Sequence, residues 1–551
     1  MTDLFRKGLD LILKRQTNIL SAAFVIMSTV ILSQLLGIVK KRLLVSIFGP
    51  TNAVGVYTAA SVLPDFLFQV VIAVALSSAF IPVFAGYMSK NEKKEANEMA
   101  SALLTVGTSL FIVLGIVLAV FAPYVLQVMN LGSGFSADQM SLMVNLMRLL
   151  LIGQLMFLVG VFFTALLQTH NHFFVPGFAA ALYNLGIIVG ILTLKQYGMY
   201  GPTIGNILGA ALFVSLQIPV IRKVGFRFKL NFDYRNPGLQ KVLHLMWPRS
   251  IANIVFNISS VFTISLISFM PSAGRNYVLL DLAQALAFAP VTLFGQSIAQ
   301  AAFPILAKEK DNPEEFKSTF ITSFNQMLYL VLPVSVLLLI LRIPIVRLIY
   351  GASTNFDWPA TVLTGRILAF YSICIFSESL KALLARGFYA LHDTKTLLIT
   401  STLSTLLMLG LSAYFIVGLR LGIMSIAFSY SVSSILEMCI LFLILEHRLH
   451  GFDRRFLVIS WLKIFSATFF TAFALYIPIK LLDQLVFDTT KTINLLLLTG
   501  ISSLAGVSIY LLLTWLFNVK EAFTYMVMFK KLGTWREIMN KQSEIIENTK
   551  F

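Results

Sequence analysis

Long apolar stretches recur along the whole chain and are separated by short segments that carry most of the charge. An α-helix needs about 20 apolar residues to cross a hydrocarbon core roughly 30 Å thick. A β-barrel would show alternating segments of about ten residues instead. The pattern predicts an all-α polytopic membrane protein with about 14 transmembrane helices, at 17–39, 54–87, 98–129, 140–168, 173–194, 199–221, 240–269, 276–306, 318–349, 361–391, 396–417, 421–445, 457–483 and 492–517.

The composition supports a membrane location. Of 551 residues, 58% are hydrophobic and 12% are charged, whereas soluble domains carry about 25% charged residues. Two cysteines, Cys374 and Cys439, fall inside predicted helices, so the sequence offers neither a disulfide framework nor a set of metal ligands. We therefore expect no metal and no bound cofactor.

The charges are unevenly distributed over the loops. A net charge of +17 can indicate nucleic acid binding, but here the basic residues gather in alternate loops, which is the pattern that sets membrane orientation. We therefore expect no nucleic acid partner and place the N and C termini in the cytoplasm. The basic residues assigned to that side include Arg6, Lys7, Lys90, Lys93, Lys94, Arg222, Lys223, Arg227, Lys229, Arg235, Arg454 and Arg455.

One cluster breaks this pattern. Lys40, Lys41 and Arg42 follow the first apolar stretch, at the end that the orientation places outside. One explanation is an anionic ligand that is reached through a water-filled cavity. The other is that these long side chains extend to lipid headgroups.

The chain also contains an internal repeat. Pro82 and Pro304 lie in similar segments, His170 and His392 lie in another similar pair, and the sequence separation is identical in the two pairs. An offset that spans six helices keeps both copies in the same orientation, and transporters built from such repeats bind substrate between the halves. The predicted segments are 1–16 (amphipathic, cytoplasmic), 17–222 (first lobe), 223–239 (basic linker), 240–446 (second lobe), 447–517 (two further helices) and 518–551 (amphipathic cytoplasmic tail).

Several motifs resemble those of the MurJ (MviN) family of lipid II flippases, in the superfamily of multidrug, oligosaccharidyl-lipid and polysaccharide (MOP) exporters. They are "SQLLGIVKKRLLVSIFG" at 33–49, "SSAFIPVFAGY" at 77–87, "LFGQSIAQAAFPILAKE" at 293–309 and "RGFYALHDTKT" at 386–396. The resemblance implies two six-helix lobes of MATE type plus two C-terminal helices. It also implies a transporter rather than an enzyme, located in the bacterial cytoplasmic (inner) membrane.

By the same resemblance, the substrate is lipid II, a lipid-linked peptidoglycan precursor of the undecaprenyl-pyrophosphate type. Alternating access would move it to the outer leaflet for cell-wall synthesis. We expect a monomer in contact with membrane lipids, and cell-wall synthesis proteins are candidate partners. Coupling to the membrane potential or to a monovalent ion is expected, because the chain has no ATP-binding motif.

The resemblance also points to substrate-binding residues. The family's first helix reads like Ser-Arg-x-x-Gly-x-x-Arg, and here Gln34 and Lys40 occupy the two arginine positions. Cations pair with phosphate oxygens, and ionisable residues at bilayer depth are functional candidates. The predicted headgroup-binding residues are Gln34, Lys40, Lys41, Arg42, Asp65 and Arg249. The alternative for Asp65 is a stabilising ion pair, and the alternative for Arg249 is pairing with Asp65 or Asp281.

A second set of charged residues lies in one later helix. Glu378 and Lys381 have the i, i+3 spacing that brings side chains together, and Arg386 follows near the cytoplasmic end. They are candidates for a gate or for ion coupling, although Arg386 can equally extend to headgroups.

Three functions stay open on the sequence alone. The first is a lipid II flippase. The second is a related exporter, either a flippase for another lipid-linked glycan or a cation-coupled drug antiporter that uses Asp65 and Glu378. The third is a non-transporting scaffold for cell-wall enzymes, since fold and site are separate inferences.

Overall fold

The computed structural model describes residues 19–73, 79–129, 134–351, 353–485 and 491–532. Within these ranges the side chains of residues 19–24, 26, 72–73, 247–257, 456, 483–485 and 527–532 are not described. The described chain is helical, without strands, which confirms the predicted fold class. The predicted N-terminal segment 1–16 lies outside the described residues, as do residues 533–551 of the predicted tail.

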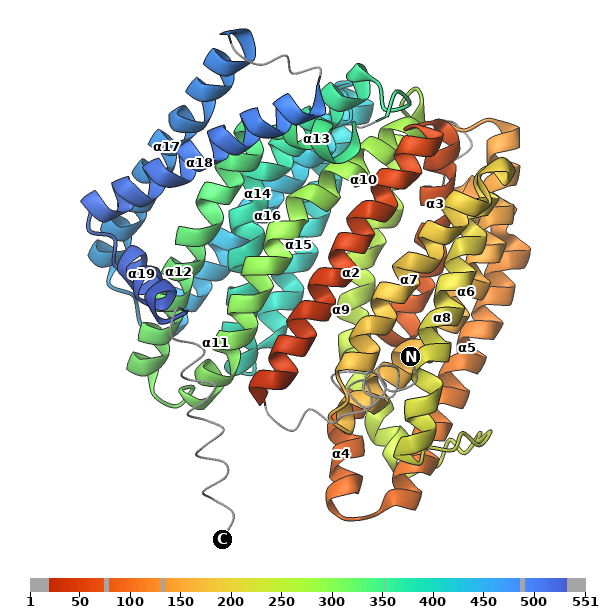
Figure 1. Ribbon diagram of the computed structural model, residues 1–551. Coiled ribbons are helices and arrows are strands. Elements are labelled where there is room, and N and C mark those ends of the chain that lie inside the picture. The colour runs from red at the N-terminus through yellow and green to blue at the C-terminus, as the bar shows by residue number, and fades with distance from the viewer. Residues whose placement is uncertain (1–18, 74–78, 130–133, 352, 486–490, 533–551) are drawn as a thin grey trace, which may run out of the picture. The chain divides into compact units, whose positions relative to one another are not determined.

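The helices follow the predicted apolar stretches closely (Figure 1). Their bounds are α2 (Ile19–Phe48), α3 (Asn52–Phe68), the π-helix η1 (Gln69–Ala73), α4 (Ile81–Ser89), α5 (Lys93–Val128), α6 (Ala137–Thr169), α7 (Phe174–Thr193), η4 (Lys195–Tyr197) and α8 (Tyr200–Val224). Next come α9 (Pro237–Ile267), α10 (Ala273–Pro290), the π-helix η5 (Val291–Gln296), α11 (Ser297–Lys308), α12 (Pro313–Ile340), α13 (Arg342–Tyr350) and α14 (Trp358–Ala390). The last are α15 (Thr394–Ala413), the π-helix η6 (Tyr414–Gly418), α16 (Met424–Arg448), α17 (Arg454–Leu485), α18 (Thr492–Leu516) and α19 (Lys520–Leu532).

Twelve helical segments of the described chain are long and apolar enough to cross a membrane. The two other predicted spans, 17–39 and 240–269, fall on α2 and α9, which are 30 and 31 residues long. The exact count of fourteen stays a prediction. One predicted span was wrong in detail, because 318–349 is divided into α12, which ends at Ile340, and α13. Pro344 has no N–H to bond the Ile340 carbonyl four residues earlier, and its ring clashes with that carbonyl in a continuous helix. In the first turn of α13 the missing N–H costs little.

The helix boundaries recur with the offset of the sequence motifs. The π-helices η1 and η5 begin at Gln69 and Val291, which have the same separation in sequence as Pro82 and Pro304. The long helices α6 and α14 begin at Ala137 and Trp358, and their separation is shorter by a single position. These two pairs of helix starts are in line with the predicted repeat, and the repeat and the two lobes at 17–222 and 240–446 stay predictions.

The chain divides into two compact units. Unit 1 comprises Met1–Leu282, Ile349–Thr361 and Leu409–Ile426, and unit 2 comprises Ala283–Leu348, Val362–Met408 and Ala427–Phe551. Unit 1 thus contains the whole predicted first lobe together with α9 and the first half of α10.

Small residues set the packing inside unit 1. Gly186 and Gly190 on α7 face Gly205 and Gly209 on α8, and a Cβ added at Gly186 would overlap the Gly209 Cα atom. Glycines four residues apart on one helix let two backbones approach closely, which is a common way to join helices in a membrane. Substitution there forces the helices apart.

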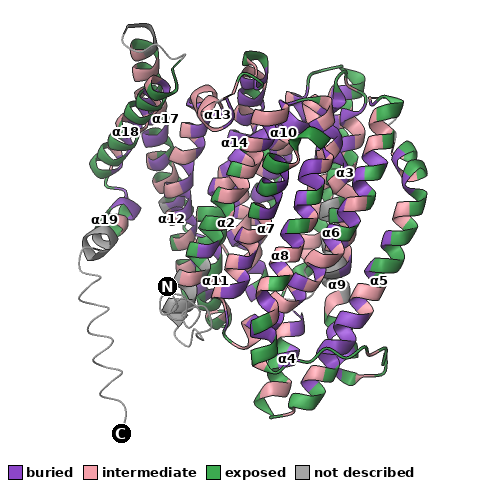
Figure 2. Ribbon diagram, turned by 45° about the vertical axis from the view of Figure 1, so that its right-hand side comes forward, coloured by how far each residue is buried: buried purple, intermediate pink, exposed green. Residues whose placement is uncertain are grey.

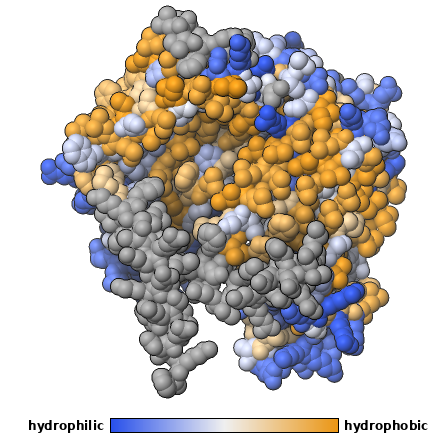
Figure 3. Space-filling view, viewed as in Figure 1, coloured by the Kyte–Doolittle hydropathy of each residue, from blue (hydrophilic) through white to orange (hydrophobic). Residues whose placement is uncertain are grey.

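In unit 2, α17 and α18 pack together and α12 packs against α17. The buried residues of α18 recur every three or four positions, as Figure 2 shows by the purple stripe along this helix, and they are Leu495, Leu498, Ser502, Gly506, Tyr510 and Thr514. The rest of α18 is largely exposed and apolar, including Ile493, Leu504 and Leu511. Broad apolar surface of this kind is visible in Figure 3, with hydrophilic side chains gathered toward the margins, and it is expected where helices face lipid.

Candidate functional site

In unit 1 an ion pair joins two helices that are far apart in the sequence. The Lys41 Nζ atom on α2 lies 2.7 Å from Asp281 Oδ2 on α10. Lys41 is seven residues before the end of α2 and Asp281 is eight residues after the start of α10, which is roughly 10 to 12 Å along each helix. Their side chains are 27% and 36% exposed, so the pair is accessible from outside the protein.

A close helix crossing holds α3 against α10 beside this ion pair. A Cβ at Gly55 would overlap the Gly274 Cα atom. The Arg275 backbone N–H donates to Asn52 Oδ1 at 2.9 Å, and its guanidinium bonds both carboxylate oxygens of Asp357 at 2.8 Å. Burial alone would raise the pKa of Asp357, but the bonds from Arg275 and from the Ala360 amide outweigh it and hold the pKa below its usual range.

Asp65 lies deeper along α3. It is thirteen residues after the first residue of the helix, or roughly 20 Å, and it is exposed. The buried Gln154 side chain on α6 donates from Nε2 to Asp65 Oδ1, and the Gln154 Oε1 atom is buried without a partner among the described residues. An exposed carboxylate at this position is far less costly in water than in hydrocarbon, which favours a hydrated surface here.

Lys40 belongs to the same set of charges. It is half-buried, and its charge interacts with those of Lys41, Asp281 and Asp65. Two lysines and two aspartates therefore balance one another in what we call the unit 1 charge cluster, which comprises Lys40, Lys41, Asp65 and Asp281. The predicted substrate-binding residues Lys40, Lys41 and Asp65 are thus brought together.

The other three predicted substrate-binding residues are Gln34, Arg42 and Arg249. Gln34 and Arg42 are exposed, and within the described part of the chain neither side chain has a hydrogen bond or ion pair. Arg249 lies on α9, but its side chain is outside the described residues, so its predicted role and its predicted pairing with Asp65 or Asp281 stay open.

Unit 2 contains a second group of charges, and this one is buried. The Lys381 Nζ atom on α14 lies 2.7 Å from Glu378 Oε1 and 2.9 Å from Glu437 Oε2 on α16. The pairing of Glu378 with Lys381 confirms the i, i+3 prediction. The exposed fractions of Lys381, Glu378 and Glu437 are 18%, 14% and 9%.

Serine hydroxyls complete this network. Ser401 on α15 donates to Glu437 Oε1 at 2.7 Å, and Ser434 donates to Glu378 Oε1 at 2.8 Å. We call Glu378, Lys381, Glu437, Ser401 and Ser434 the unit 2 network. It holds two carboxylates and one ammonium, so it carries one excess negative charge when all three are ionised.

Arg386 is not drawn into an ion pair within the described chain. Its guanidinium lies over the rings of Phe303 and Tyr389, at 5.7 and 6.0 Å from their centres. Cation–π contacts of this kind hold the side chain locally. They are compatible with a gate and with a purely structural role.

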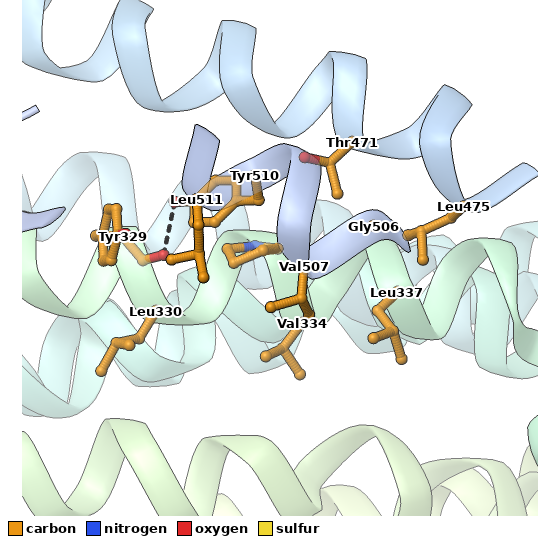
Figure 4. Close-up of a pocket in the computed structure, with 11 residues that line it drawn as sticks. Tyr329, Leu330, Val334, Leu337, Thr471, Leu475, Gly506, Val507, Tyr510 and Leu511 are labelled. Carbon is orange, nitrogen blue, oxygen red and sulfur yellow. Dashed lines mark hydrogen bonds between the residues drawn. The ribbon is translucent and has the colours of Figure 1, made fainter. Parts of the chain in front are cut away.

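An apolar pocket of about 170 Å³ lies elsewhere in unit 2, between α12, α17 and α18 (Figure 4). Tyr329, Leu337, Leu475 and Val507 are among its lining residues, and the Tyr510 hydroxyl donates to the Tyr329 carbonyl at 2.7 Å. The pocket contains none of the predicted site residues, and it offers apolar contacts rather than charge.

Sequence reasoning placed Asp281 only as a competing partner of Arg249, and it missed Gln154, Ser401 and Ser434. Lys41 and Asp281 are joined across two helices that no local spacing relates. Ser434 on α16 bonds Glu378 on α14, and Ser401 on α15 bonds Glu437 on α16, so neither contact has a local spacing that could have indicated it. Among the described residues, no three His, Cys, Asp or Glu side chains are placed to hold a metal ion.

Comparison with known proteins gives a consistent result. A family model described as lipid II flippase MurJ matches residues 44–499. The probable lipid II flippase MurJ of Buchnera aphidicola subsp. Schizaphis graminum is 24% identical over 479 residues, covering 83% of this chain and 90% of the relative. That of Thermotoga maritima is 27% identical over 432 residues, covering 78% and 85%.

Solved structures share the fold. A lipid II flippase MurJ in an inward closed conformation has a TM-score of 0.74 at 22% identity, covering 90% of this chain and 98% of that one. An inward-facing multidrug resistance MATE family transporter of the MOP superfamily has a TM-score of 0.61 at 15% identity, covering 78% and 98%. At these identities the likeness concerns the fold alone.

Proposed function

The chain belongs to the lipid II flippase MurJ family, and we propose that it moves lipid II from the inner to the outer leaflet of the bacterial cytoplasmic membrane by alternating access. The family assignment makes it a transporter, and its helices make it a multi-pass membrane protein. Lipid II as the substrate, transport toward the outer leaflet and the bacterial cytoplasmic membrane as the location are all parts of this proposal.

The transport task requires no covalent chemistry. A multiply charged headgroup must pass a hydrocarbon layer without losing polar partners, and buried or half-buried cations can replace water around phosphate oxygens. The observation that carries the proposal is the unit 1 charge cluster, which brings half-buried Lys40 and Lys41 together with exposed Asp65. Gln34, Arg42 and Arg249 are further candidate headgroup ligands.

We assign coupling to the unit 2 network. Its excess negative charge would attract a proton or another monovalent cation, and a charge inside the membrane also responds to the membrane potential. Glu378 and Lys381 are the coupling residues under this proposal, and Arg386 is a candidate gate residue. No ATP is required.

The remaining features of the proposal concern location and partners. Both termini lie in the cytoplasm by the positive-inside rule. The working unit is a monomer in contact with membrane lipids, and cell-wall synthesis proteins are candidate partners. Labelling of single engineered cysteines by a membrane-impermeant reagent from either side of the membrane tests the orientation.

Two experiments test the flippase directly. Purified protein in vesicles should transfer fluorescent lipid II between leaflets, whereas a glycolipid with the same chain and no phosphate should not be transferred. Expression in a bacterium depleted of its own flippase should restore growth. A well-folded preparation that transfers no lipid II, together with failed rescue, would contradict the proposal.

A related exporter is the second candidate, and one observation favours it. Lys41 is already neutralised by Asp281, and Gln34 takes the place of a family arginine, so fewer cations are available than the family pattern implies. Transport of another lipid-linked glycan, or drug efflux that is lost in Asp65→Asn, would favour this candidate over lipid II transport.

A further inference from the structure

We propose that Asp281 competes with the substrate for Lys41. Its carboxylate holds Lys41 until a phosphate group of the substrate displaces it. The inference rests on the proposed function for the identity of the incoming anion. It makes Asp281 a specificity-determining residue rather than a structural one.

The first support is the way Asp281 is held. Lys41 Nζ contacts Asp281 Oδ2 at 2.7 Å and the Asp281 carbonyl oxygen at 3.5 Å. Within the described residues this ammonium is the one hydrogen-bonding partner of the carboxylate, whose side chain is 36% exposed. In a hydrated cavity, water can solvate Asp281 as soon as Lys41 leaves it, and the displacement leaves no buried charge unpaired.

The second support is the charge balance of the cluster. Lys40 has no hydrogen bond or ion pair in the described chain, but its charge interacts with Asp281 and Asp65. An approaching pyrophosphate group meets two lysines whose charges are cancelled by two aspartates. It gains full attraction only when one carboxylate moves away, since like charges at close range are mutually unfavourable.

A competitor of this kind sets the affinity of the site. If Lys41 is unpaired for about a tenth of the time, the apparent affinity for an external anion is about tenfold weaker than the intrinsic one. An anion with two adjacent phosphate groups can engage Lys40 while it replaces Asp281 on Lys41, whereas a monovalent carboxylate offers no advantage over Asp281 itself. The pair therefore favours the binding of polyanions over the binding of singly charged anions.

The test measures binding of inorganic pyrophosphate to the purified full-length protein at low salt, without divalent cations. Asp281→Asn should bind roughly tenfold more tightly than the wild type, and Asp281→Glu should resemble the wild type. Lys41→Gln should remove the gain when combined with Asp281→Asn. Asp357→Asn is the matched control, because Asp357 pairs with Arg275 at 2.8 Å and not with Lys41.

Parallel titrations with undecaprenyl pyrophosphate, undecaprenol and phosphatidylglycerol vesicles separate the sources of phosphate. A gain in Asp281→Asn for undecaprenyl pyrophosphate and inorganic pyrophosphate, but not for undecaprenol, supports the inference. A gain in affinity that is largest for phosphatidylglycerol would show that membrane lipid, rather than the substrate, competes with Asp281 for Lys41. That result would overturn the inference.

A measurement on the wild-type protein makes the inference independent of mutant folding. Carbodiimide labelling of carboxylates, read by mass spectrometry, should increase at Asp281 when pyrophosphate is added. Unchanged labelling, or unchanged affinity in a folded Asp281→Asn variant, would overturn the inference. Tighter pyrophosphate binding in a protein that flips no lipid II would leave it standing and remove the proposed function instead.

Discussion

The unit 1 charge cluster and the unit 2 network contain the same bond in different surroundings. In both, a lysine lies 2.7 Å from a carboxylate oxygen. In unit 1 the paired carboxylate of Asp281 is 36% exposed and is bonded by Lys41 alone among the described residues. In unit 2 the paired carboxylate of Glu378 is 14% exposed and is bonded by both Lys381 and Ser434. The same ion pair is therefore exchangeable in one place and fixed in the other.

This difference predicts where mutation costs stability and where it costs transport. Removing one member of a buried, hydrogen-bonded pair leaves an uncompensated charge. Removing one member of an exposed pair leaves a charge that water can solvate.

The largest effect is expected for Lys381→Met. Two carboxylates of the unit 2 network lose their common cation, and the free energy of unfolding should fall by about 3–5 kcal/mol. Thermal unfolding in detergent measures the loss. Adding Glu378→Gln and Glu437→Gln to the same chain should recover most of it, and a triple variant as unstable as the single one would contradict this account.

The serine contacts should give the next largest effect. Ser434→Ala removes a hydrogen bond to the buried Glu378 carboxylate at 2.8 Å, and bonds to charged groups contribute about 1.5–3 kcal/mol. In unit 1, Gln154→Leu removes the bond to exposed Asp65 and also an unsatisfied buried oxygen, so its cost should stay under about 1 kcal/mol. Equal losses in the two variants would remove the distinction between the regions.

A smaller stability effect is expected for Lys41→Met. The partner Asp281 stays hydrated, so the unfolding free energy should change by about 1 kcal/mol or less. Lipid II transfer in vesicles should nevertheless fall at least tenfold under the proposed function. A variant that is strongly destabilised would show that the pair is structural.

The smallest effect concerns acid stability at a helix end. Asp393 caps α15, because its Oδ1 atom accepts a hydrogen bond from the Thr396 backbone N–H at 3.1 Å. Its Oδ2 atom lies 2.6 Å from Arg448 Nη1. Burial opposes ionisation of Asp393, but the bonds from Thr396 and the charge of Arg448 outweigh it and lower its pKa. A carboxyl group whose pKa is lowered on folding stabilises the folded state at pH values above its unfolded pKa of about 4. This stabilisation is lost as the pH falls through the lower, folded-state pKa.

Asp393→Asn should therefore flatten the loss of stability between about pH 5 and pH 3, by under about 1 kcal/mol. Asp311→Asn is the control, because Asp311 is exposed in the turn before α12. The two stability profiles should differ in the acid range alone. A parallel offset of the Asp393→Asn profile at neutral pH would reflect the lost cap rather than titration.

Local patterns predicted most of the fold. Apolar length located the helices, and the sequence offset between Pro82 and Pro304 matches the offset between the starts of η1 and η5. Periodicity did not show the break between α12 and α13, because the segments before and after it are both rich in apolar residues and Pro344 acts on backbone geometry. Apolarity cannot distinguish one long helix from two consecutive ones.

The candidate sites were predicted only where their geometry is local. Glu378 and Lys381 share one helix face, so their pairing followed from spacing. Lys41 on α2 pairs with Asp281 on α10, and Asp65 on α3 is bonded by Gln154 from α6. Such partners are set by tertiary packing, which no single segment contains.

The most direct measurement is the rate of lipid II transfer by Lys40→Gln/Lys41→Gln compared with Lys93→Gln/Lys94→Gln. Both variants remove two adjacent lysines, but Lys93 and Lys94 are exposed at the start of α5. We expect at least a tenfold loss in the first variant and a change of less than about twofold in the second, with both proteins folded. Equal rates in the two variants, or an equal loss in both, would contradict a role of Lys40 and Lys41 in transport.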